Sequence, residues 1–215
     1  MTPWPAWDGN DFEDLPILIK AQGKTTTDHI SPAGPWLKLR GHLDKFSDNL
    51  LSGGTNAFTD EPGTAINVLG NKGTDTVANV ARIYKAAGRK WVIVGDANYG
   101  EGSSREHAAL SPRLLGGVAV IAKSFARIHE ANLKKQGLLA LTFQNPDAYD
   151  SLGAEDRLNL TGLDDLAPGK PVTCTVRRAD GSTDTLRLNH TFSESQLGWF
   201  RSGSAVNLFN QSQAA

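Results

Sequence analysis

A short polar stretch, Ser103–Arg105, carries the residue types in this 215-residue chain that are best suited to chemistry. It follows the apolar run Trp91–Val94, which is long enough for one buried strand. Between the two lies a loop that contains Gly95, Gly100 and Gly102. Two hydroxyls and one permanently charged guanidinium therefore stand directly after a glycine-rich turn.

The order of these residues predicts a helix that begins on an anion site. Ser103 and Ser104 stand where a helix N-cap is expected, Arg105 opens the first turn, and Pro112 is predicted to interrupt the helix. Backbone N–H groups at a helix start attract anions, and a guanidinium can hold a carboxylate or phosphate through two hydrogen bonds. The interpretation as a purely structural turn is equally favoured by the residues, because neither the dinucleotide-binding nor the P-loop glycine pattern occurs.

A second polar cluster lies near the start of the chain. Leu15–Ala21 is predicted as a short buried strand, and the polar run Thr25–His29 follows its end, where α/β proteins bind ligands. From the residues alone, the structural interpretations are preferred. Asp28 is then a helix cap, and Arg40 is an ordinary surface arginine.

Strands and helices are predicted to alternate around these clusters. The patterned segments are a helix over Thr76–Ala87 that ends at Gly88, a strand over Gly116–Ala122, a helix over Ser124–Lys135 and a strand over Leu138–Phe143. Strand, helix and strand in this order favour parallel strands with a right-handed crossover. We therefore expect an α/β fold with a central mixed or parallel sheet flanked by helices.

The remaining segments carry weaker patterns. Leu51–Thr74 is predicted as a long surface loop, and Asp147–Leu163 as a small excursion. The last elements expected are a hairpin of Pro171–Val176 and Thr185–Leu188 around Asp180-Gly181, and an amphipathic tail over Glu194–Leu208 in which Trp199 and Phe200 pack.

Composition excludes several classes of protein. Lysine plus arginine is 22 and aspartate plus glutamate is 23, so the net charge of -1 gives no electrostatic case for nucleic acid or anionic membrane. No apolar segment approaches the length of a membrane-spanning helix. The single cysteine, Cys174, lies in an alternating run and is expected in a strand, so no metal site made of cysteines alone is expected.

The N-terminal residues lack the basic start and apolar run of a signal peptide, and they are too acidic for a transit peptide. Residues 1–14 are instead predicted to be a connecting segment that is anchored by Trp4 and Trp7. Residues 15–215 are predicted to form a single domain.

Several long, irregular motifs resemble the aconitase family, in particular the C-terminal swivelling domain of the mitochondrial-type members. They are GKTTTDHIS over Gly23–Ser31, GPWLKLRGHLD over Gly34–Asp44, YGEGSSREHAAL over Tyr99–Leu110, KSFARIHE over Lys123–Glu130 and NLKKQGLL over Asn132–Leu139. The resemblance extends from about Trp7 to Leu208. It implies a swivelling β/β/α domain that closes over the rest of the enzyme.

The resemblance also implies a reaction and roles for the polar residues. The family interconverts citrate and isocitrate through cis-aconitate. Ser103 matches the base, which acts as an alkoxide, while Ser104 and Arg105 match groups that bind one substrate carboxylate and Arg40 matches a clamp on another. Three more positions match the family's substrate-binding site: Thr27, Asp28 and Ser31.

The same resemblance implies what this chain must obtain elsewhere. The family uses a [4Fe-4S] cluster held by cysteines of the preceding domains, and Cys174 matches none of them. The expected partners are therefore the tricarboxylate substrates and cluster-bearing aconitase domains, joined in cis or supplied in trans. The compartment implied is the mitochondrial matrix in a eukaryote and the cytoplasm otherwise.

Three alternatives stay open at this point. The chain could be the small subunit of an isopropylmalate or homoaconitate hydratase, although Glu101 and the GPWLKLRGHLD stretch depart from that pattern. It could bind citrate alone, as a sensor without catalysis. It could also be a regulatory RNA-binding domain, against which the near-neutral charge weighs.

Overall fold

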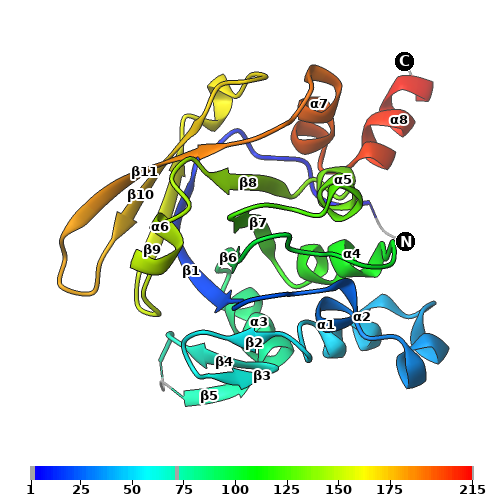
Figure 1. The fold of residues 1–215 in the computed structure, drawn as a ribbon. Helices are drawn as coiled ribbons and strands as arrows, with labels where there is room; N and C mark the ends of the chain where they lie inside the picture. The colour runs from blue at the N-terminus through cyan, green and yellow to red at the C-terminus, as the bar shows by residue number, and fades with distance from the viewer. Residues whose placement is uncertain (1–2, 71–72, 215) are drawn as a thin grey trace.

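A computed structural model describes residues 3–70 and 73–214 of the chain. Within these residues, seven strands close into a barrel in the order β1-β6-β7-β8-β11-β10-β9 (Figure 1). Their bounds are β1 Phe12–Lys20, β6 Trp91–Gly95, β7 Gly117–Ala122, β8 Leu139–Phe143, β9 Arg157–Thr161, β10 Val172–Arg177 and β11 Thr183–Asn189. The expected α/β class and mixed sheet are confirmed, and the sheet is closed on itself.

The parallel half of the barrel is buried on both faces. Strands β1, β6, β7 and β8 pair in parallel, and every residue of β6 and β7 is buried. Alternate residues face opposite sides, so Val92 and Val94 join the cluster inside the barrel while Ile93 joins a second cluster outside it. Residues of helices α3 (Val77–Ala86), α4 (His107–Leu114) and α5 (Arg127–Lys135) complete that outer cluster. This burial explains the continuous apolar runs in the sequence.

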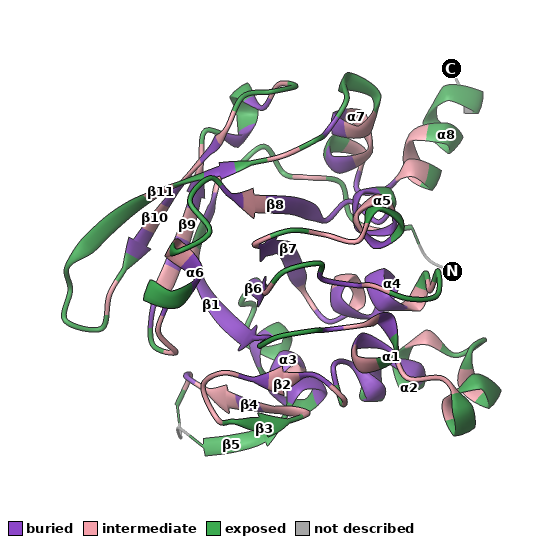
Figure 2. Cartoon of the chain, in the orientation of Figure 1, coloured by how far each residue is buried: buried purple, intermediate pink, exposed green. Residues whose placement is uncertain are grey.

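The antiparallel half exposes its outer face to water. Strands β9 and β10 alternate between buried and partly exposed residues, and the β10–β11 hairpin extends beyond the barrel (Figure 2). Leu158 and Leu160 of β9 point inward, and β9 closes the barrel by pairing with both β1 and β10. The segment predicted as a small excursion, 147–163, contains a barrel strand that the sequence analysis missed, because the alternating Arg157–Thr161 segment supplies the closing strand.

The prediction of a long surface loop over 51–74 is wrong for the residues that the structure describes. Residues 71 and 72 lie outside the described residues. Two small antiparallel sheets form there: β2 (Thr55–Asn56) with β3 (Glu61–Pro62), and β4 (Thr64–Asn67) with β5 (Gly73–Thr76). The Asn56 side chain accepts from the backbone N–H of Lys20 and donates to the Thr64 carbonyl. Pairing through strands of two to four residues leaves no periodic pattern in the sequence.

Helix ends follow the expected chemistry. Thr76 caps α3, and Gly88 follows its end with a φ of 68°. The amphipathic tail is divided at Gly203 into α7 (Glu194–Ser202) and α8 (Ala205–Ala214), with Phe200 buried and Trp199 partly buried. The short helices are α1 Thr27–Ile30, η1 Gly34–Leu39, α2 Leu43–Phe46, η2 Ser47–Asn49, α6 Ala148–Ser151 and η3 Leu163–Asp165.

The described N-terminal residues lie along the barrel. Trp4 donates to the Gln136 side chain at 2.9 Å, and the Trp7 ring packs on Phe200 with centroids 5.3 Å apart. Among the described residues, no helix has the length and apolar character needed to cross a membrane.

Candidate functional site

The glycine-rich loop runs from the end of β6 to the start of α4, and it is longer than expected. Helix α4 begins at His107, with Glu106 at the N-cap position and no side-chain cap. Ser103 and Ser104 therefore lie in the loop and do not cap the helix, so the N-cap prediction is wrong. The helix also continues through Pro112 to Leu114, which corrects the predicted interruption.

Backbone hydrogen bonds join this loop to the one that follows β1. The Gly100 N–H donates to the Thr25 carbonyl at 2.8 Å, and the Thr27 N–H donates to the Glu101 carbonyl at 2.8 Å. Thr26 and Glu101 form a parallel bridge between these bonds. The two loops extend from neighbouring strands at the same edge of the barrel, and these bonds join them there.

Arg105 lies across the junction of the two loops. One guanidinium nitrogen, Nη2, lies 2.5 Å from a carboxylate oxygen of Asp28. The other, Nη1, donates to the carbonyl of Ser31 at 2.9 Å and to that of Thr27 at 3.4 Å. A guanidinium has five N–H donors, so Nε–H and one Nη2–H have no partner among the described residues and can hold an anion. The arginine is thus oriented before any ligand binds.

The predicted site residues around Arg105 lie in different environments. Thr27, Ser103, Ser104 and Arg105 line a cavity of about 500 Å³, and both serines are exposed. The Ser31 side chain is fully buried, and Ser31 instead contributes the carbonyl that orients Arg105. Asp28 likewise contacts Arg105 and does not line the cavity.

Helix α5 adds residues to this cavity that the sequence did not single out. Arg127, His129 and Asn132 line it, with His129 and Asn132 almost fully buried. Both ring nitrogens of His129 and the Asn132 amide nitrogen have no hydrogen-bond partner in the described structure. Burial lowers the pKa of His129 to about 4, so the ring is neutral near pH 7. The signals for these residues were the KSFARIHE motif, which contains Arg127 and His129, and the NLKKQGLL motif, which begins at Asn132; we used both only for the family resemblance.

A close backbone approach sets the position of the loop over His129. Gly100 has a φ of 84°, and a Cβ atom placed on it would lie 2.2 Å from the imidazole Cδ2. Only glycine fits both the left-handed conformation and the contact. The Tyr99 ring also packs against the His129 ring, with ring centroids 5.5 Å apart. The loop and α5 are therefore packed as one unit.

Arg40 lies outside the 500 Å³ cavity. It caps the C-terminal end of η1, its side chain is exposed, and it lines a separate hollow of about 460 Å³ together with His107. His107 is the first residue of α4, two positions after Arg105. The two predicted carboxylate-binding arginines thus line different cavities near the start of α4.

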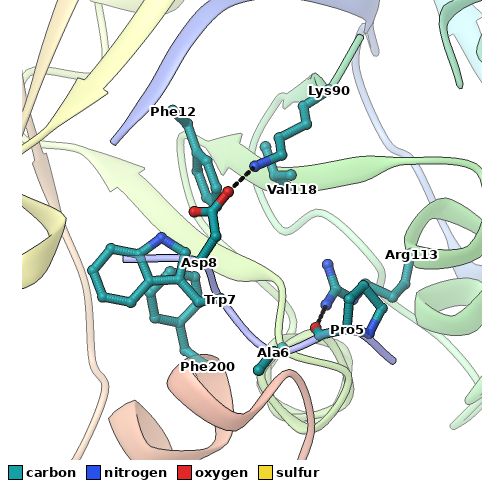
Figure 3. Close-up of a pocket in the computed structure, with 10 residues that line it drawn as sticks. Pro5, Ala6, Trp7, Asp8, Phe12, Lys90, Arg113, Val118 and Phe200 are labelled. Atoms are coloured by element: carbon teal, nitrogen blue, oxygen red, sulfur yellow. Dashed lines mark hydrogen bonds and ion pairs between the residues drawn. The ribbon is translucent and has the colours of Figure 1, made fainter. Parts of the chain in front are cut away.

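A further cavity, of about 240 Å³, lies where the strands β1, β6 and β7 begin (Figure 3). Its charged groups bind within the chain: Lys90 lies 3.5 Å from a carboxylate oxygen of Asp8, and Arg113 donates to the Pro5 carbonyl at 3.0 Å. Aromatic rings of Trp7 and Phe200 form another side. This cavity anchors the N-terminal segment to the barrel.

Metal-binding side chains are not gathered at one place in the part of the chain that the structure describes. Among the described residues, no group of three or more histidine, cysteine, aspartate or glutamate side chains is placed to hold a metal ion. Cys174 is fully buried inside the barrel, and burial raises the pKa of its thiol to about 12. A thiolate ligand for an iron–sulfur cluster does not fit that position.

Comparison with known proteins gives three findings. Residues 15–146 match the model of the aconitase C-terminal domain family. Over 96% of the chain, the sequence is 62% identical to mitochondrial aconitate hydratase of Gracilaria gracilis and 55% identical to that of Saccharomyces cerevisiae. The chain spans only 26% of the length of each of these relatives.

Among solved structures, 3-isopropylmalate dehydratase from Methanocaldococcus jannaschii superposes with a TM-score of 0.57. The match covers 89% of both chains at 22% sequence identity. At this identity, the likeness shows a shared fold only.

We expect Gly100→Ala to destabilise the chain by more than about 3 kcal/mol, because the new methyl group meets the His129 ring and the backbone keeps a positive φ. Gly162→Ala is the matched control, since Gly162 has a φ of 75° with nothing within 4 Å. That variant should lose only about 1–2 kcal/mol. Urea denaturation measures both, and equal losses would show that the contact with His129 is unimportant.

The buried, neutral His129 predicts a pH-dependent stability. Because folding lowers its pKa from 6.5 to about 4, the unfolded chain binds a proton between these values that the folded chain does not. Stability should therefore fall as pH drops from 6.5 to 4, by at most about 3 kcal/mol from this group. His129→Phe should remove that part of the slope. Denaturation at several pH values tests it, and parallel curves for the two proteins would contradict it.

Proposed function

The chain belongs to the aconitase family, as its C-terminal domain, and we propose that it supplies the base and part of the carboxylate-binding site of an aconitate hydratase. The reaction is the dehydration of citrate to cis-aconitate and its rehydration to isocitrate. The observation that carries this proposal is the placement of Ser103, Ser104 and a pre-oriented Arg105 on one cavity. The names of the relatives supply the reaction class.

Ser103 is proposed as the base that removes a proton from the carbon beside a substrate carboxylate. A serine hydroxyl is a weak base, so it acts only where its oxyanion is stabilised. Its exposed position lets a substrate approach it, and the nearby guanidinium of Arg105 supplies positive charge. Rehydration then requires the serine to return a proton to carbon.

The substrate carboxylates are proposed to bind on both sides of the α4 start. Arg105 has two free N–H groups after its bonds to Asp28, Ser31 and Thr27, and Ser104 lies beside it on the cavity. Arg40 takes a second carboxylate from the neighbouring hollow. Thr27 forms part of the cavity wall, while Asp28 and Ser31 act by orienting Arg105.

Other parts of the enzyme must complete the site. The relatives are about four times as long as this chain, so we propose that the [4Fe-4S] cluster and its ligands come from their remaining length, joined in cis or in trans. We also propose residues 1–14 as the connection and 15–215 as the swivelling domain that closes over the cluster. A mitochondrial location is proposed from the names of the relatives.

The direct test is a chimera in which this chain replaces the matching C-terminal region of the Gracilaria gracilis relative. We expect the chimera to interconvert citrate and isocitrate, and Ser103→Ala to lower its kcat by at least about 100-fold because the base is lost. Ser111→Ala is the control, as its hydroxyl is buried without a partner in α4. A folded chimera that binds citrate without turning it over would favour a sensor role instead.

Arg105→Lys in the same chimera should raise the KM for citrate by about 10-fold or more. An ammonium group cannot keep the bonds to Asp28 and the carbonyl groups while also gripping a carboxylate with two hydrogen bonds. Arg89→Lys is the matched control, because Arg89 forms a 3.0 Å ion pair with Asp14 that is not part of the site. Unchanged citrate kinetics in Arg105→Lys would rule out this residue as the clamp.

A further inference from the structure

His107 connects the start of α4 to the segment that carries Arg40. Its Nε2 atom lies 3.0 Å from the Arg40 carbonyl oxygen. A carbonyl group only accepts, so Nε2 carries the hydrogen and donates it. The imidazole also packs on Phe46 of α2, with ring centroids 4.3 Å apart. Two contacts thus fix the orientation of this ring.

The segment around Arg40 has little other anchorage. Helix η1, Gly34–Leu39, contains no buried residue, and Leu37 is 51% exposed. Its backbone bonds are local ones, such as the Arg40 N–H to the Leu37 carbonyl at 3.2 Å. Within the residues that the structure describes, the bond from His107 is the only hydrogen bond between residues 33–41 and another segment. A segment with few buried contacts is easily displaced when such a bond is lost.

We propose that His107 is a positioning residue that holds Arg40 at a fixed place relative to Arg105. The carbonyl that His107 holds belongs to Arg40 itself. Loss of this hydrogen bond therefore frees the backbone from which the Arg40 side chain extends. His107 opens α4 two residues after Arg105, so its bond to Arg40 is made next to the Ser103–Arg105 loop, whose arginine is held by Asp28 and Ser31. Two clamps at a fixed separation bind a substrate with several carboxylates at a smaller entropic cost.

The functional part of this inference rests on the proposed function, whereas the structural part does not. The competing explanation is that His107 only fills space against Phe46. Two substitutions separate these roles. His107→Phe keeps an aromatic ring and removes the N–H donor, while His107→Gln keeps an N–H donor and removes the ring.

The structural part is tested on the 215-residue chain by amide hydrogen exchange. His107→Phe should speed exchange several-fold at the amides of Arg40 and His42, and His107→Gln should restore part of the protection. His190→Phe is the matched control, since the His190 Nε2 makes a similar 2.9 Å bond to the Lys170 carbonyl in another part of the chain. Unchanged exchange over residues 34–42 in His107→Phe would overturn the proposal.

The functional part is tested by kinetics of the chimera. His107→Phe should raise the KM for citrate about 5- to 10-fold with a smaller change in kcat, and His107→Gln should recover much of it. In an Arg40→Gln background, His107→Phe should have no further effect, because the group that it positions is gone. Additive effects of the two substitutions would overturn the positioning role. An inactive parent chimera would instead count against the proposed function, and the hydrogen-exchange result would still decide the structural part.

Discussion

The hydrogen bonds between the loops that follow β1 and β6 hold the candidate site together. Two bonds of 2.8 Å, from Gly100 to Thr25 and from Thr27 to Glu101, join segments more than 70 residues apart in the sequence. Because the loops are held in register, Asp28 and the Ser31 carbonyl reach Arg105 and fix its guanidinium. If the loops separated, Ser103 and Arg105 would be displaced together.

The buried polar layer beneath these loops gives the site a second constraint. His129 lies directly under Gly100, neutral and almost without exposure, and the hydroxyl of Tyr99 beside it has no partner in the described structure. Unpartnered polar groups in a buried place cost free energy, and natural proteins keep them mainly at sites that bind water or ligand. Of these two residues, only His129 lines the cavity, so its ring is the one placed beside the site.

In the proposed function, the chain supplies one side of an active site. It brings a hydroxyl, two arginines and a neutral histidine to one edge of a barrel, yet its described residues hold no metal-binding group. This division suits a reaction in which one part of the protein holds the metal and another carries the base and closes over the substrate. Closure of the proposed site would exclude water, and excluding water strengthens the electrostatic contacts of arginine side chains.

The sequence by itself determined the parallel half of the fold and the residue types of the site. The buried runs over Trp91–Val94, Gly116–Ala122 and Leu138–Phe143 became strands because both of their faces are covered, and Gly88 ended its helix because it tolerates a positive φ. The motifs around Ser103 and Arg105 identified the family.

The tertiary structure alone decided how these parts meet. The β9 strand was missed because only its partners β1 and β10 give its short alternating segment a place in the barrel. Pairing with Thr25–Thr27 holds Gly100 and Glu101 outside any helix, and helix α4 starts at His107. The Ser31 carbonyl accepts from Arg105, and His107 donates to the Arg40 carbonyl. Both bonds join residues 67 or more positions apart, which local sequence patterns do not record.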